Sequence, residues 1–137
     1  MIKSLSQYKE DYRKSVENPV EFWSEYSKSF LWEKEPSNIL SWNFEDPDVK
    51  WFFDGKLNIT ENIFERNKKN ENDTAIIWEP NEPNDKNIEL SYSQLFEEVC
   101  SFSNVLKSLG VKKGDRVIIY LPMIPEAAIS MLACARI

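Results

Sequence analysis

Apolar side chains recur with two different periods along this chain, and a polar stretch at residues 67–73 separates the two halves. In the first half, apolar residues lie about one helical turn apart in residues 6–16 and again in residues 19–30. Ser6 is the expected cap of the first helix, and Pro19 is the expected first residue of the second. The sequence therefore predicts two short helices at the start of the chain.

Regular patterning weakens after these helices. We expect a loop over residues 36–50, because its few aromatic side chains stand among Ser, Asn, Asp and Pro. A turn is expected at Asp54-Gly55. Apolar spacing then indicates one more short helix over residues 59–64, with Asn58 or Thr60 as its cap.

The second half is far more regular. Residues 74–79 form a predicted strand, and residues 88–90 alternate as an antiparallel partner would, so a hairpin is the simplest interpretation. Ser91 and Gln94 have the spacing of a capping box at the start of a helix. Apolar residues continue at intervals of three and four up to Gly110, which is a left-handed stop signal.

The last segment predicts a turn at residues 112–115, a strand at 116–121 and a helix beginning near Pro125. From Ala127 to Ile137 this helix is apolar nearly all round and has no stop signal. A helix of that kind is typical of the interior of a larger α/β layer. The pattern predicts that the polypeptide is the N-terminal part of a longer protein. The alternative is a natural terminus on a helix that packs in a dimer.

Composition removes many kinds of active site. The chain of 137 residues has no His and only 3 Gly, which excludes imidazole-dependent nucleophiles, histidine zinc sites and glycine-rich phosphate loops from these residues. A net charge of -6 argues against nucleic acid as a partner. No stretch has the length of a signal peptide core or a membrane span, so we expect a cytoplasmic protein with no membrane partner. Cys100 and Cys134 are expected to be core thiols.

Every local candidate for chemistry has a structural interpretation that is preferred. The aromatic run Trp51–Phe53 and Trp78 are expected to pack in cores rather than stack on a ligand. Lys112–Asp115 precedes a strand, whereas phosphate loops follow one, so it is interpreted as a turn. Acidic pairs are expected on solvated faces or loops: Glu97-Glu98, Asp46 and Asp48, and Glu79 and Glu82. We therefore predict no catalytic, cofactor-binding or metal-binding residue in this chain.

Residues 110–137 (GVKKGDRVIIYLPMIPEAAISMLACARI) closely resemble the start of the adenylate-forming domain of acetyl-CoA synthetases, the AMP-forming acetate–CoA ligases. Residues 8–23 resemble the leader that precedes this domain, residues 50–58 resemble the end of that leader, and residues 75–79 resemble the first strand beyond it. The resemblance implies an α/β protein with a helical N-terminal leader at 1–66. The first, incomplete α/β layer of an AMP-binding domain is then expected at 67–137.

The same resemblance implies the chemistry of the complete enzyme. Acetate and ATP with Mg2+ give acetyl-AMP and pyrophosphate, and CoA then displaces AMP to give acetyl-CoA. In such enzymes the residues that do this lie beyond the part that these 137 residues resemble. The expected partners are therefore acetate, ATP and CoA in the full-length enzyme, with none bound by this chain alone. Alternatives are a propionyl-CoA or acetoacetyl-CoA synthetase, or a free-standing non-catalytic interaction module.

Overall fold

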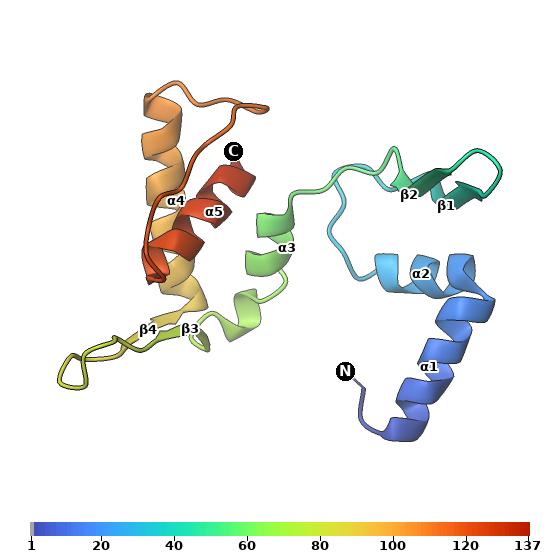
Figure 1. Ribbon diagram of the computed structural model, residues 1–137, viewed down its shortest axis with the longest axis horizontal. Helices are drawn as coiled ribbons and strands as arrows, with labels where there is room; N and C mark the ends of the chain where they lie inside the picture. The colour runs from blue at the N-terminus through green and yellow to red at the C-terminus, as the bar shows by residue number, and fades with distance from the viewer. Residues whose placement is uncertain (1) are drawn as a thin grey trace. The chain divides into compact units, whose positions relative to one another are not determined.

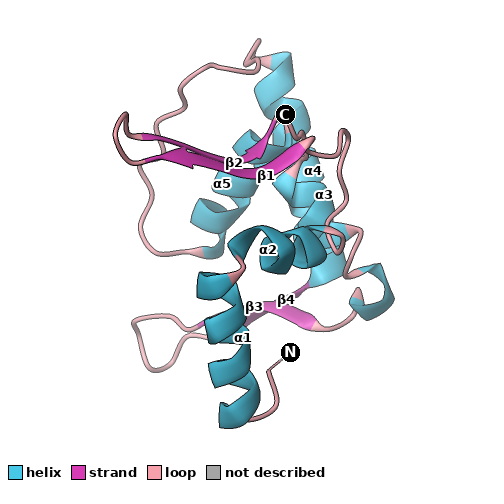
Figure 2. Cartoon of the chain, turned by 90° about the vertical axis from the view of Figure 1, so that its right-hand side faces the viewer, coloured by secondary structure: helices cyan, strands magenta, loops and turns pink. Residues whose placement is uncertain are grey.

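The computed structural model describes residues 2–137, which divide into two compact units, with the boundary in the sequence between Leu57 and Asn58. Each unit contains one two-stranded antiparallel hairpin, drawn in magenta in Figure 2, together with helices. This is the mixed α/β class that the sequence predicts, with helices first and the more regular elements after them. No helix within the described residues is long and apolar enough to cross a membrane.

The first unit begins with helices α1 (Leu5–Glu17) and α2 (Pro19–Ser27). The N-cap of α1 is Ser4 and not Ser6, because the Ser4 side chain accepts a hydrogen bond from the backbone N–H of Gln7. Pro19 opens α2 as predicted.

The expected loop at residues 36–50 is wrong. Strands β1 (Asn38–Asn43) and β2 (Asp48–Phe53) form a hairpin there. In their register Leu40 faces Trp51 and Trp42 faces Val49, so one face of the hairpin is apolar. These cross-strand pairs outweigh the loop propensity of the Ser, Asn and Asp residues between them.

The second unit begins with α3 (Ile59–Phe64), whose N-cap is Asn58, one of the two caps expected. The polar stretch that follows contains a 3-10 turn, η1 (Lys68–Asn70), which the sequence did not predict. Strands β3 (Thr74–Trp78) and β4 (Ile88–Ser91) form the predicted hairpin, with a bulge between Thr74 and Ile76.

Helices α4 (Tyr92–Ser108) and α5 (Pro125–Arg136) pack side by side and form the core of the second unit (Figure 1). The predicted capping box of α4 is present, since Ser91 and Gln94 each accept a hydrogen bond from the other's backbone N–H. Gly110 has a φ of 87°, as a left-handed stop requires. The buried side chains of the core cluster are Phe64, Leu95, Val99, Leu106, Ile129 and Ala133.

A buried polar contact joins these two helices. Ser103 on α4 donates its hydroxyl to the Val99 carbonyl at 2.7 Å, and the Ala133 carbonyl of α5 lies 3.3 Å from the same oxygen. Small side chains at this point let the helix backbones approach closely. On its other side α5 leaves Met131 exposed, so the nearly all-apolar helix is buried on one face only in this structure.

The predicted strand at residues 116–121 is not formed. The segment has no regular secondary structure, and no ladder pairs it with another strand among residues 2–137. Its side chains still alternate as strand residues do: Ile118 and Tyr120 are 92% and 98% exposed, whereas Val117 and Ile119 are 40% and 37% exposed. A strand needs a neighbour for its backbone groups, and none is present here.

Candidate functional site

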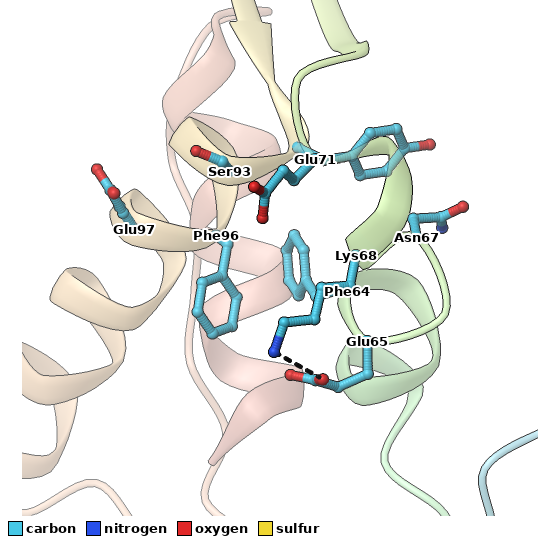
Figure 3. Close-up of a pocket in the computed structure, with 9 residues that line it drawn as sticks. Phe64, Glu65, Asn67, Lys68, Glu71, Ser93, Phe96 and Glu97 are labelled. Carbon is cyan, nitrogen blue, oxygen red and sulfur yellow. Dashed lines mark ion pairs between the residues drawn. The ribbon is translucent and has the colours of Figure 1, made fainter.

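The pocket in Figure 3 lies in the second unit, where α3 and η1 meet the first turn of α4. Its volume is about 230 Å³. Its lining residues are Phe64, Glu65, Asn67, Lys68, Glu71, Tyr92, Ser93, Phe96 and Glu97. None of these residues was predicted to form a site, because they come from three elements that only the fold brings together.

Local hydrogen bonds build this pocket. The Ser93 N–H donates to the Glu71 carbonyl at 2.9 Å, which fixes the start of α4 against the end of the polar stretch. Asn67 donates its side-chain amide to the Ile63 carbonyl at 2.6 Å, and so closes the end of α3. The Phe64 and Phe96 rings form the floor, in an edge-to-face contact with centroids 5.0 Å apart.

The chemistry of this pocket is limited. Lys68 lies 3.9 Å from Glu65, and both groups are largely exposed to solvent. Ser93 is the only aliphatic hydroxyl in the lining, and no imidazole or thiol stands among the lining residues to activate it. Nor do residues 2–137 contain a cluster of acids or cysteines that could hold a metal ion. The carboxylates and the lysine of the lining make no hydrogen bond to the Ser93 hydroxyl, so the pocket does not hold a nucleophile paired with a base.

The best organised polar group is Asp54, at the end of β2. Its carboxylate accepts hydrogen bonds from the Lys34 ammonium at 2.5 Å and from the N–H and hydroxyl of Ser37 at 2.8 Å each. These bonds, that from Lys34 first, lower the pKa of Asp54 to about 2. Phe52 and Asp54 both have left-handed φ values, of 48° and 59°, so this carboxylate holds a strained turn closed. Its role is structural.

The aromatic run does not pack as completely as predicted. Phe52 packs its ring against Trp32, with centroids 5.8 Å apart, but Trp51 and Phe53 are about half exposed. Trp78 is partly buried, and its indole N–H donates to the Met123 carbonyl at 2.7 Å, as a structural Trp would.

The turn predicted at Lys112–Asp115 is confirmed, because the Asp115 carboxylate accepts the Lys112 N–H at 2.7 Å and the Asp115 N–H donates to the Lys112 carbonyl. Cys100 and Cys134 are free thiols, but they are half-buried rather than fully in the core. The acidic residues singled out in the sequence are all exposed, as predicted: Glu97, Glu98, Asp46, Asp48, Glu79 and Glu82. The structure does not gather them into one site.

Comparison with known proteins identifies the protein family of this chain. The family of AMP-binding enzymes ("AMP-binding enzyme") matches residues 63–137, more than half of the chain. This chain belongs to that family. The preceding residues 8–63 match the family described as "Acetyl-coenzyme A synthetase N-terminus". Together the two matches cover residues 8–137 and so include both units of the chain.

Relatives agree with these matches. An acetyl-coenzyme A synthetase of Desulfatibacillum aliphaticivorans is 51% identical over 134 residues, and one of Yersinia pestis is 50% identical over 134 residues. One of Novosphingobium aromaticivorans is 44% identical over 135 residues. The matched region covers 95–96% of this chain but only 20–21% of each relative. The chain is thus homologous to the N-terminal region of acetyl-coenzyme A synthetases, and spans about a fifth of their length.

Proposed function

We propose that this chain is the N-terminal region of an acetyl-CoA synthetase whose complete form makes acetyl-CoA from acetate, ATP and CoA through acetyl-AMP. The observation that carries the proposal is the match of 95–96% of the chain to acetyl-coenzyme A synthetases, across both units. The relatives named above are all acetyl-coenzyme A synthetases, which favours acetate over propionate or acetoacetate as the acyl substrate.

Within this proposal the chain supplies structure and no catalytic residue. No phosphate loop, activated nucleophile or metal cluster is found among residues 2–137, which supports locating the ATP, Mg2+ and CoA sites in the rest of the enzyme. The exposed segment 116–121 supports the same division, because its alternating side chains and open backbone suit a strand whose neighbours come from the remaining polypeptide. We place the leader at 1–66 and the start of the AMP-binding domain at 67–137, in a cytoplasmic enzyme.

A chimera tests the proposal with a positive readout. The matched N-terminal region of the Yersinia pestis enzyme is replaced by this chain, and acetate-dependent ATP–pyrophosphate exchange is measured. We expect the chimera to be active, whereas the Yersinia pestis enzyme lacking that region, and this chain alone, are expected to be inactive. A chimera that folds, as judged by circular dichroism and a cooperative melt, but catalyses no exchange would refute the proposed function. Exchange by the 137-residue chain alone would refute the location of the active site.

A further inference from the structure

An apolar groove of about 500 Å³ lies in the first unit, between the α1–α2 elbow and the β1–β2 hairpin. Figure 1 shows the hairpin next to α2 within this unit. The hairpin wall is built from Leu40, Trp42, Val49 and Trp51, which the strand register places on one face. The helical wall includes Trp23, whose ring meets that of Trp51 edge to face with centroids 6.1 Å apart.

The groove is open and almost entirely apolar. Trp42 is 61% exposed within it, and Phe44 at its edge is 87% exposed. Only Ser15 and Asn43 contribute polar side chains, and the Asn43 side-chain oxygen already accepts the Glu45 N–H at 3.0 Å. Small-molecule sites carry several convergent polar groups that fix orientation, and this groove lacks them. Exposed Trp side chains in an open groove are instead typical of protein interfaces.

Charge around the groove is acidic. Glu45 and Asp46 stand exposed at the hairpin tip and form no ion pair within the part of the chain that the structure describes. Asp48, beside them, is paired with Lys50 at 2.6 Å. On the helical side Glu17 is paired with Arg13, so the uncompensated charge is negative. Such a rim repels polyanions, which excludes nucleic acid and anionic membrane surfaces as occupants.

The same charge argues against a second copy of this chain. A two-fold symmetric contact through this groove would bring two copies of the acidic hairpin tip into one interface, and this would add like charge there. From these observations we infer that the groove is a docking surface for a basic, amphipathic protein segment. The apolar side chains of this segment fill the groove beside Trp42, and its Lys or Arg side chains lie against Glu45 and Asp46.

The test titrates the purified 137-residue chain with two synthetic helical peptides and follows calorimetry and tryptophan fluorescence. Both peptides are about 14 residues long and carry Leu at positions i, i+3, i+4 and i+7. One has Lys at the remaining positions, and the other has Glu. We expect the affinity for the Lys peptide to be at least about tenfold higher than that for the Glu peptide. This ratio should fall as the salt concentration is raised.

Variants localise the binding. Charge reversal at the rim, Glu45→Lys with Asp46→Lys, is expected to lower the affinity for the Lys peptide about tenfold. The matched control reverses two exposed acids in the other unit, Glu79→Lys with Glu82→Lys, and is expected to leave affinity unchanged. Trp42→Ala is expected to abolish binding. Phe44→Ser removes an 87% exposed ring that lies edge to face with Trp42, with centroids 6.1 Å apart, and is expected to weaken peptide binding.

Four outcomes would overturn the inference. They are failure of both peptides to bind, equal binding of the Lys and Glu peptides, equal effects of the rim and control reversals, and self-association of the chain that Phe44→Ser abolishes. Circular dichroism of each variant separates loss of the groove from loss of the fold.

Discussion

Val99 provides the sharpest test of how the second unit is held together, because its side chain is fully buried between α4 and its neighbours. Val99→Ala removes two methyl groups, which costs about 1.6 kcal/mol at roughly 0.8 kcal/mol for each buried group. A void of roughly 50 Å³ adds about 1 kcal/mol. The better helix propensity of Ala returns about 0.5 kcal/mol. We therefore expect a net loss of about 2 kcal/mol in the free energy of unfolding.

Val105, on the same helix, is the matched control. It is 47% exposed, so Val105→Ala makes the same chemical change with little buried area to lose. Its expected effect lies within about 0.5 kcal/mol of zero. Urea unfolding followed by far-UV circular dichroism measures both variants, with similar m-values expected. The packing of α4 described here is refuted if Val99→Ala costs no more than Val105→Ala.

Four further predictions follow from single contacts. Gly55→Ala should destabilise the first unit by about 1–3 kcal/mol in urea unfolding, since a Cβ there would lie 2.8 Å from the Trp32 ring, and this exceeds the entropic gain of about 1 kcal/mol. Because its folded pKa is depressed, Asp54 stabilises the fold above its ordinary pKa of 3.8, and this contribution is lost as pH falls towards about 2. Acid titration followed by tryptophan fluorescence should show that transition in the wild type and lose it in Asp54→Asn. Ser91→Ala should lower the free energy of unfolding by about 1 kcal/mol, because it removes the side chain that caps α4. An unchanged free energy of unfolding would show that the capping box does not stabilise the helix. Tyr120→Ser should reduce the binding of a hydrophobic dye without changing the circular dichroism spectrum, and unchanged dye binding would contradict the exposure of this residue.

The sequence predicted the β3–β4 hairpin and helix α4 of the second unit because their signals are local. The capping box at Ser91, the spacing of apolar residues in α4 and the left-handed glycine at 110 each act within a few residues. The hairpin at residues 38–53 was missed for the opposite reason. Its stability comes from pairs such as Leu40 with Trp51, which are 11 residues apart and leave no periodic pattern among Ser, Asn and Asp.

The candidate pocket could not have been predicted by the same means. Phe64 and Phe96, which form its floor, are more than 30 residues apart in sequence, and only the packing of α3 on α4 joins them. The Asp54 cluster depends on Lys34 and Ser37 in a different segment, although the Asp-Gly turn itself was visible. The turn at Lys112–Asp115 was predicted because its signal is local, and its hydrogen bonds join residues only three apart.

The segment 116–121 shows where local signals and tertiary structure separate. Its residues have strand propensity, and their alternating exposure is that of a strand, yet no ladder forms. Propensity sets the backbone conformation of each residue, whereas a ladder requires a partner at the right distance and register. In acetyl-coenzyme A synthetases the matched region is about a fifth of the polypeptide, so most possible partners lie outside it. Within the described residues, segment 116–121 therefore has the alternating exposure of a strand without the backbone pairing that defines one.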